Sequence, residues 1–441
     1  MPQRIGSRRG FLRHSTAALT LGAGLPAWYA RDAVAALDEA TARPRPRAEK
    51  LRFAAIGTGS RGVAVMGDAL DRGAECVAVC DVDKAHRADG IKRVGKEVPQ
   101  YEDFREILDR KDIDFVTVVV PDHWHALVSI AAMKAGRDVY CEKPLTLTID
   151  EGKALVKVAR DKKTVFQTGS QQRSDARFRL ACELVRNGRL GKIQTVETRI
   201  GDNPQEGPFP VAQVPNGLNW DTWMGPTPEV DYVERRCHYE FRWWYEYSGG
   251  KVTDWGAHHN DIAQWGLGTD ETGPVLVEST HDPLKHPVPN AYNCYPGFKI
   301  TYTYAPNASK YADGTKVVCS AEGDNGVKFV GEGGWIFVDR GQIQASDPKL
   351  LAEPLPGDAI RLTKSDDHMR NFLDAIGSRE RPICDVAIGH RSVTVCHLGN
   401  ISLRMGGKQL VWQPEKERFF GDALANQMLS RPMRAPWKIE A

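Results

Sequence analysis

Hydrophobic and polar positions follow two different patterns along the chain. Between residue 50 and about residue 172, short uninterrupted apolar runs alternate with segments whose apolar residues recur every three to four positions. The runs predict strands at 51–57, 76–81, 115–121, 138–144 and 164–170. The periodic segments predict helices at 61–70, 102–110, 125–136 and 148–162. Continuous apolar strands separated by helices indicate a doubly wound α/β domain, whose parallel sheet is covered on both faces.

The second pattern begins after about residue 172. A predicted helix at 175–191 precedes a strand at 193–200 in which apolar and polar residues alternate. Similar strands, joined by turns that contain glycine, are predicted at 275–282, 298–306, 315–322 and 326–344. Helices are predicted near 367–378 and 388–403. The chain therefore divides into an α/β domain over 50–172 and an α+β domain over 173–441 with a large, mostly antiparallel sheet.

The N-terminal segment has the features of an export signal. The adjacent arginines Arg8 and Arg9 precede a modestly apolar run, and small residues near 33–36 form a cleavage site. We predict a twin-arginine signal over 1–36, recognised by the twin-arginine export machinery, a Pro-rich linker over 37–49 and a periplasmic protein. The alternative is a basic tail before a short amphipathic helix. The run is too short and too rich in Gly and Ala for stable membrane insertion.

Composition is typical of a soluble globular protein. Of the 441 residues, 41% are hydrophobic and 26% are charged, and the net charge is +2. Such a charge does not suggest nucleic acid as a partner. Of the nine cysteines, Cys76, Cys80 and Cys141 lie in apolar strands, where buried free thiols are common. We expect few or no disulfides.

A glycine-rich loop follows the first predicted strand. Gly57, Gly59 and Gly62 have the spacing G-x-G-x-x-G, and Ser60 and Arg61 lie between the last two. This spacing after a strand and before a helix is typical of a dinucleotide-binding loop, in which backbone amides and the helix N-terminus face a pyrophosphate. All five residues are candidate cofactor contacts. The alternative is an ordinary surface turn.

An acidic residue ends the second predicted strand. Asp81 lies 19 residues beyond Gly62, where a carboxylate can accept hydrogen bonds from an adenosine ribose and repels a 2′-phosphate. We therefore predict NAD as the cofactor. Lys84 and Arg87 lie close enough in sequence to soften the preference against NADP.

Polar residues follow two later strands. Pro121 ends the third strand and precedes Asp122 and His125, so His125 either contacts the nicotinamide ribose or lies in the first turn of a helix capped by Asp122. The strand at 138–144 ends in Glu142, Lys143 and a proline, the residue type at which cis peptide bonds occur. At the ligand-binding edge of the sheet, the Lys143 ammonium can bind a substrate hydroxyl and exchange a proton with it. The alternative for Lys143 is a solvated surface lysine.

The segment 249–268, GGKVTDWGAHHNDIAQWGLG, reads as a helix with charged residues among tryptophans. Asp254, His258, Asp261 and Trp265 are spaced 4, 3 and 4 residues apart and so share one face, whereas His259 points elsewhere. This face suits the wall of a pocket for a polyol. It also suits buried polar residues that bond one another across a domain interface. Asp254 and His258 could ligate a metal, but only the distant His123 or His125 could complete the site, so we expect no metal.

The loop, the EKP sequence at 142–144 and the segment 249–265 together resemble the glucose–fructose oxidoreductase/inositol dehydrogenase (Gfo/Idh/MocA) family. The segments 219–228 and 368–392 look like those of an exported bacterial subgroup. The resemblance implies a Rossmann domain followed by an open-faced antiparallel sheet domain that often mediates oligomerisation, hence a homo-oligomer. It also implies that Lys143, Asp254 and His258 line the nicotinamide site. The candidate substrate contacts are Asp261, Trp265 and Arg173.

These features predict an NAD-dependent oxidoreductase that acts on a carbinol carbon of a sugar or polyol. His258 would be the general base, Asp254 would orient it and Lys143 would polarise the oxygen, although the proton acceptor could be either Lys143 or His258. Because an exported enzyme meets no dinucleotide pool, we expect tightly bound NAD that is recycled in place. The alternatives are a redox-neutral, NAD-dependent glycoside hydrolase and a non-catalytic sugar-binding module.

Overall fold

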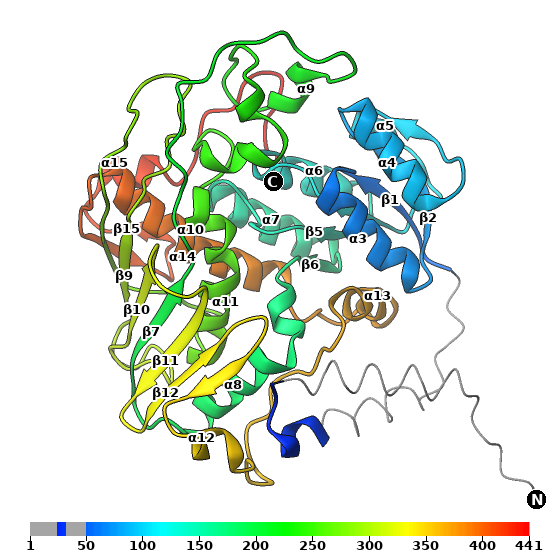
Figure 1. Ribbon diagram of the computed structural model, residues 1–441. Coiled ribbons are helices and arrows are strands. Elements are labelled where there is room, and N and C mark those ends of the chain that lie inside the picture. The colour runs from blue at the N-terminus through cyan, green and yellow to red at the C-terminus, as the bar shows by residue number, and fades with distance from the viewer. Residues whose placement is uncertain (1–23, 32–49, 441) are drawn as a thin grey trace, which may run out of the picture.

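The computed structural model describes residues 24–31 and 50–440 (Figure 1). The predicted linker and most of the predicted export signal therefore lie outside the described residues. Within the described part of the chain, no helix is long and apolar enough to cross a membrane. All nine cysteines are buried free thiols, as expected from their positions in apolar segments.

The first lobe is a six-stranded parallel sheet in the order β3-β2-β1-β4-β5-β6. Its strands are β1 (Arg52–Ile56), β2 (Glu75–Cys80), β3 (Gln100–Tyr101), β4 (Phe115–Val118), β5 (Asp138–Cys141) and β6 (Phe166–Thr168). Its helices are α3 (Ser60–Asp71), α4 (Lys84–Val94), α5 (Phe104–Leu108), α6 (Asp122–Lys134) and α7 (Ile149–Lys162). This arrangement confirms the predicted doubly wound domain. Helix α4 has no apolar stripe in the sequence, since only its Gly90 is buried, and for this reason it was not among the predicted helices.

The second lobe is built on a nine-stranded sheet in the order β13-β12-β11-β7-β10-β9-β8-β14-β15. Its strands are β7 (Ile193–Arg199), β8 (Leu276–Thr280), β9 (Lys299–Thr303), β10 (Lys316–Ser320), β11 (Gly326–Gly331), β12 (Gly334–Val338), β13 (Ile343–Ala345), β14 (Leu410–Gln413) and β15 (Arg418–Phe419). All neighbouring strands are antiparallel except β7 and β10, which confirms the predicted mostly antiparallel sheet. Helices α8 (Ala176–Arg186), α11 (Gly256–Leu267) and α14 (Val386–Arg404) pack on it.

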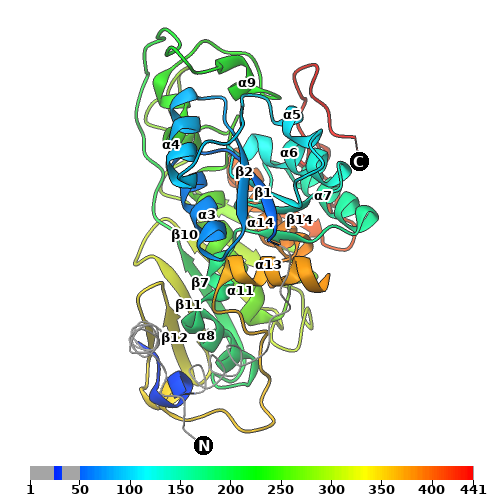
Figure 2. The ribbon, with the colours of Figure 1, turned by 90° about the vertical axis from the view of Figure 1, so that its right-hand side faces the viewer.

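Segments from the C-terminal half of the chain return to the first lobe. Helix α13 (His368–Ser378) lies beside α3 (Figure 2), and its Phe372 packs edge-on against Phe115 of the parallel sheet, with ring centroids 5.4 Å apart. Helix α14 contacts α7 and β6. The core of the first lobe is therefore completed by residues far from it in the sequence.

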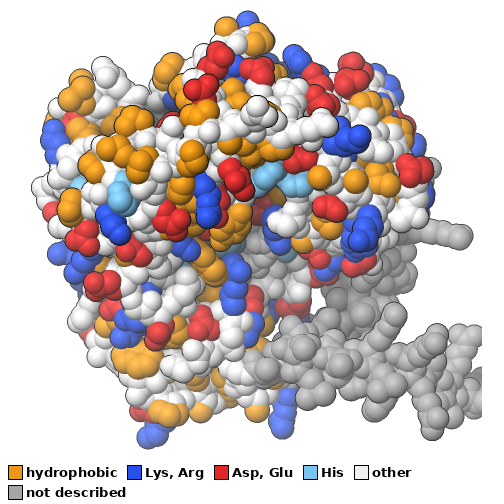
Figure 3. Space-filling model, turned by 45° about the horizontal axis from the view of Figure 1, so that its top comes forward, with side chains coloured by type: hydrophobic (Ala, Val, Ile, Leu, Met, Phe, Trp, Pro, Cys, Tyr) orange, Lys and Arg blue, Asp and Glu red, His pale blue; other side chains and the backbone are white. Residues whose placement is uncertain are grey.

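A long excursion, residues 201–249, connects β7 to the short helix α10 (Gly250–Asp254), and we call it the strap. It contains one short α-helix, α9 (Trp220–Met224), and lies at the top of the view in Figure 1. The strap has its own core of buried aromatic side chains, namely Trp220, Trp223, Tyr232, Phe241, Trp243, Trp244 and Tyr247. These aromatic residues follow neither helical nor strand periodicity, so the sequence pattern predicts no element here. Over the described part of the face in Figure 3, acidic and basic side chains are interspersed.

Candidate active site

A cavity of about 500 Å³ lies between the carboxyl edge of the parallel sheet and the strap. Its walls come from the loop after β1, the end of β2, the start of α6, the end of β5, the strap and α10. Nine of the predicted site residues line it, namely Gly57, Gly59, Ser60, Arg61, Gly62, Asp81, Glu142, Lys143 and Asp254. The cavity is therefore at the edge where doubly wound sheets bind their ligands.

No residue with a side chain would fit at the first glycine of the loop. Gly57 has φ +86°, and a Cβ atom there would lie 2.2 Å from the carbonyl oxygen of Val119. The tight turn therefore admits only glycine here, and α3 then begins at Ser60 with its N-terminus at the cavity. A helix N-terminus in this place favours the negative charge of a pyrophosphate.

Asp81 lies beside this loop. Its Oδ2 accepts a hydrogen bond from the Thr58 amide at 2.8 Å. His86, which was not among the predicted site residues, also lines the cavity, and its Nδ1 is 3.4 Å from the same Oδ2. The hydrogen bond to Asp81 raises the pKa of His86. Lys84 and Arg87 do not line the cavity; Arg87 donates a hydrogen bond to the Asp81 carbonyl oxygen instead.

The cavity continues to Lys143 at the end of β5. The Lys143 Nζ is 2.6 Å from Asp254 Oδ1 and donates a second hydrogen bond to the Asp254 carbonyl oxygen at 3.1 Å. Burial acts to raise the pKa of Asp254, but the positive charges of Lys143 and Arg242 outweigh it and leave the pKa lowered. Asp254 is therefore ionised at neutral pH. The predicted pair is brought together, and the Lys143–Pro144 peptide bond is cis.

Glu142 is held beside the phosphate loop. Its Oε1 accepts hydrogen bonds from Arg61 at 2.6 Å and from Gln171 at 2.9 Å, and its side chain is buried. Because Arg61 belongs to the first turn of α3, this ion pair ties the dinucleotide loop to the strand end that carries Lys143.

His258 lies behind the cavity wall and is not among the residues that line it. The predicted single helix is divided at Trp255 into α10 and α11, and His258 lies in the first turn of α11. Its Nδ1 is buried without a hydrogen-bond partner. Burial, together with the nearby charges of Lys143 and Arg340, lowers its pKa well below the usual range. The side chain is thus a neutral imidazole with a free ring nitrogen.

His125 does not line the cavity, so its predicted contact with the cofactor is corrected to a structural role. It lies in the first turn of α6, and its Nδ1 is 2.7 Å from the carbonyl oxygen of Pro144. It therefore supports the backbone next to Lys143. His123 is likewise occupied, with its Nε2 2.8 Å from the Trp223 carbonyl oxygen. Neither histidine completes a metal site with Asp254 and His258.

The three predicted substrate contacts lie away from the cavity. Arg173 binds both carboxylate oxygens of Asp261 at 2.8 Å, and their side chains are 2% and 0% exposed. The guanidinium also lies 5.2 Å from the ring centroid of the buried Trp265. At Asp261 and Trp265, the helix face that was a candidate wall of a polyol pocket is instead part of a buried ion pair with Arg173. This is the second interpretation that the sequence left open, namely buried polar residues that bond one another. We correct these residues to a structural role.

Asp122 and Ser248 line the cavity and were not predicted as site residues. The Ser248 hydroxyl donates a hydrogen bond to Asp122 Oδ2 at 2.5 Å. Burial raises the pKa of Asp122 to about 7, although the Ser248 hydrogen bond acts against the rise. The position of Asp122 at the ligand-binding edge gave a signal in the sequence, but its partner on the strap, 126 residues away, gave none.

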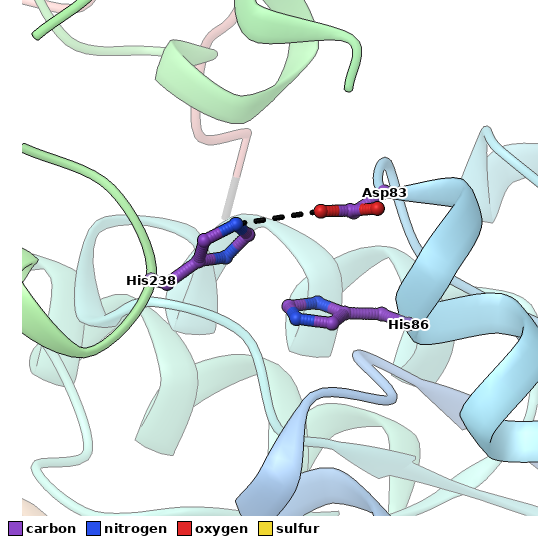
Figure 4. A group of neighbouring side chains, drawn as sticks. All are labelled: Asp83, His86 and His238. Atoms are coloured by element: carbon purple, nitrogen blue, oxygen red, sulfur yellow. Dashed lines mark ion pairs between the residues drawn. The ribbon is translucent and has the colours of Figure 1, made fainter. Parts of the chain in front are cut away.

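One group among residues 24–31 and 50–440 has the ligand atoms and spacing to hold a metal ion. Its members are Asp83, His86 and His238, and their ligand atoms lie within 4.8 Å of one another (Figure 4). The group lies beside Asp81, which His86 contacts, and two of its members, His86 and His238, line the cavity. Our expectation of no metal site stays a prediction.

Two models of one oxidoreductase family match the chain. Its NAD-binding Rossmann fold matches residues 51–170, and its C-terminal alpha/beta domain matches residues 205–439. The chain belongs to the Gfo/Idh/MocA family. This finding confirms the resemblance inferred from the loop, the EKP sequence and the segment 249–265, whereas membership of an exported subgroup stays a prediction.

Several curated proteins are similar to parts of the chain. Levoglucosan dehydrogenase of Pseudarthrobacter phenanthrenivorans is 36% identical over 106 residues, which cover 24% of this chain and 27% of that protein. Inositol 2-dehydrogenase of Rhizobium meliloti is 29% identical over 234 residues, which cover 52% and 58%. Glycosyl hydrolase family 109 protein 2 of Shewanella sp. is 31% identical over 115 residues, which cover 24% and 25%. The chain thus spans between a quarter and three fifths of the length of these relatives.

Solved structures share the fold. The WlbA dehydrogenase from Bordetella pertussis in complex with NADH and UDP-GlcNAcA has a TM-score of 0.61 and 17% identity, and the match covers 83% of this chain and 99% of that one. The aldose-aldose oxidoreductase from Caulobacter crescentus complexed with glycerol has a TM-score of 0.60 and 20% identity, over 82% and 100%.

The cavity fits NAD, the cofactor of this oxidoreductase family. Its volume of about 500 Å³ is in the usual range for ligand sites. The glycine loop and the N-terminus of α3 would hold the pyrophosphate, and Asp81 would hold the adenosine ribose. Glu142 and Lys143 follow β5 and line the same cavity, where they would lie beside the nicotinamide ribose.

Proposed function

We propose that the protein is an NAD-dependent oxidoreductase that oxidises a carbinol carbon of a sugar or polyol. The observation that carries the proposal is the Lys143–Asp254 pair, 2.6 Å apart, in the same cavity as the dinucleotide loop and Asp81. The levoglucosan and inositol dehydrogenases among the relatives support this substrate class. Bound NAD would supply the hydride acceptor.

The chain's own residues would bind and deprotonate the alcohol. The Lys143 ammonium donates hydrogen bonds and would bind the carbinol oxygen, while Asp254 holds the ammonium in place. The neutral His258 imidazole has a buried Nδ1 without a hydrogen-bond partner and is the candidate proton acceptor, although its lowered pKa makes it a weak base. Because Lys143 lines the cavity and His258 does not, a proton would reach the imidazole by way of Lys143, which would give one ammonium proton to His258 as it takes the proton of the alcohol. The structure thus favours Lys143 as the group that touches the substrate oxygen.

Reduction of the bound cofactor tests the proposal. The purified protein should contain close to one NAD per chain by mass spectrometry after denaturation. When each sugar of a saccharide panel is added, at least one should reduce the bound NAD once, which is seen as a rise in absorbance at 340 nm of one NADH per chain. Lys143→Ala should lower this rate by about 100- to 10,000-fold with NAD still bound. Lys157→Ala, which changes an exposed lysine on α7, is the matched control.

A second candidate function is redox-neutral glycoside hydrolysis. The similarity to a glycosyl hydrolase family 109 protein favours it. In this case oxidation of the sugar is reversed within the same turnover, so the net reaction is hydrolysis. Release of an aglycone without net formation of NADH would support the hydrolase, whereas a stable keto or lactone product would support the oxidoreductase. Inactivity of the wild type on every sugar would favour a non-catalytic sugar-binding module.

The proposed location is the periplasm, and the proposed route is twin-arginine export. The support is the Arg8–Arg9 pair and the apolar run that follows it. This route carries folded cargo, so NAD can be loaded before export. Replacement of both arginines by lysine should move the protein from the periplasmic to the cytoplasmic fraction. We also propose a homo-oligomer, as the open-faced sheet of this family implies, which size-exclusion chromatography with light scattering would test.

A further inference from the structure

The strap is bonded to the first lobe beside Asp81. The amide of Lys84 donates a hydrogen bond to the Gly217 carbonyl oxygen at 2.9 Å, and the Asn219 amide donates to the Val82 carbonyl oxygen at 3.0 Å. Asp83 and Leu218 form an isolated antiparallel bridge between these bonds. The strap therefore extends the backbone at the end of β2, next to the predicted ribose site.

The strap is also bonded to the first lobe at the start of α6. Trp124 Nε1 donates a hydrogen bond to the Trp223 carbonyl oxygen at 3.0 Å, and Asp122 binds Ser248. Trp223 and Ser248 both line the cavity. The strap thus forms one wall of the cavity and is fixed to the first lobe on both sides of it.

A side-chain contact closes the strap over the adenosine end. His238 of the strap has its Nε2 3.3 Å from Asp83 Oδ2, and its ring centroid is 4.6 Å from that of His86 (Figure 4). The His238 backbone has φ +49°, a conformation that is rare for a residue other than glycine. Both imidazoles line the cavity, and His86 in turn contacts Asp81. Residues of two lobes therefore converge beside the carboxylate assigned to the ribose.

We propose that the strap is a clasp that retains NAD, with His238 and Asp83 as its closing contact. This inference rests on the proposed NAD-dependent function and deepens it, because it names the residues that would slow the exchange of the cofactor. Exit of the adenosine requires the strap to leave the end of β2. The aromatic core of the strap, which includes stacked Trp220 and Trp223 rings 4.8 Å apart, makes it move as a unit. Opening therefore breaks the contact at His238 together with the backbone bonds.

Cofactor exchange tests the clasp. Protein loaded with NAD is mixed with an excess of isotopically labelled NAD, and the bound fraction is followed by mass spectrometry. His238→Ala and Asp83→Asn should each exchange roughly threefold to tenfold faster than wild type, the size expected for the loss of one partly exposed hydrogen bond, because burial lowers the pKa of His238 and leaves its imidazole neutral. The asparagine can still accept the hydrogen bond from the Ala85 amide that caps α4. The double variant should be no faster than either single variant, because both remove the same contact.

Three further results decide between explanations. His286→Ala, which removes a histidine outside the cavity, should exchange at the wild-type rate. Exchange by the wild type that is as fast as in the variants would overturn the clasp and leave the proposed chemistry intact. Release of NAD by a chelator would also overturn it, because a metal held by Asp83, His86 and His238 would then be the closing element. Slow exchange in a protein inactive on every sugar would keep the clasp and reject the proposed function.

Discussion

At the scale of single residues, Asp122 makes the stability of the folded protein depend on pH. Its pKa in the folded protein is about 7, against about 3.9 in an unfolded chain. Between these values the folded state keeps a proton that the unfolded state releases, so stability falls as the pH rises from about 4 to about 7. The full effect is roughly 4 kcal/mol.

Asp122→Asn should therefore stabilise the protein at high pH. Its amide oxygen can still accept the Ser248 hydrogen bond, and it carries no charge to bury. The variant should unfold at a higher denaturant concentration than wild type at pH 8, and the difference should vanish near pH 4. Asp161→Asn, at an exposed ion pair on α7, is the control and should change little at either pH. An equal gain for Asp122→Asn at both pH values would contradict the assignment.

Arg173 and Asp261 show how a buried pair can resemble a binding site in a sequence. Arg173→Ala leaves the Asp261 carboxylate buried and unpaired on that side, so it should lower the free energy of unfolding by about 3–5 kcal/mol. The KM for a sugar, measured below the unfolding temperature, should stay unchanged. A raised KM without loss of stability would instead support the original prediction that Arg173 contacts the substrate. Arg177→Ala, at a more exposed pair, should cost at most about 1 kcal/mol.

At the scale of elements, the short helix α10 positions Asp254. Gly250 at its start has φ +63°, and a Cβ atom there would lie 2.6 Å from Asn203 Oδ1, which accepts a hydrogen bond from the Lys251 amide. Gly250→Ala should cost about 1–3 kcal/mol, as overpacked sites do, and should slow turnover because it displaces Asp254. Gly377→Ala, at an exposed position in α13 with no neighbour near its Cβ, should instead stabilise the protein by up to about 1 kcal/mol. Thermal melts of both variants check the contrast.

The elements also show what the sequence could and could not predict. Uninterrupted strands and the glycine loop have local patterns, and with the position of Lys143 they located the cavity. Periodicity placed Asp254 and Asp261 on one face, but that face is several turns long and only its first turn reaches the cavity. The strap has no period, since its aromatic residues pack on one another. Its contacts with Asp83 and Asp122 join positions more than 120 residues apart, which no local pattern encodes.

At the scale of the whole molecule, part of the predicted export signal belongs to the core of the second lobe. Tyr29 is 4% exposed, and its hydroxyl accepts a hydrogen bond from Arg179 Nε of α8 at 2.8 Å. Trp28 Nε1 donates a hydrogen bond to the Leu351 carbonyl oxygen at 2.8 Å. Cleavage near residues 33–36 would remove this segment. The precursor and the processed protein would therefore differ in their packing as well as in their length.

A protein that lacks residues 1–36 should accordingly be less stable than the full chain. The lost burial of one aromatic side chain corresponds to roughly 1.5–3 kcal/mol. Tyr29→Ala in the full chain should lower the free energy of unfolding by a similar amount. The truncated protein has already lost Tyr29, so its stability should match that of this variant. Arg179→Lys separates the hydrogen bond from the burial, because it removes the fork that binds the hydroxyl and leaves the ring in place. Denaturant midpoints of these proteins decide the matter: if the full chain and the truncated protein unfold together, the segment does not stay docked in solution, and export processing leaves the fold unchanged.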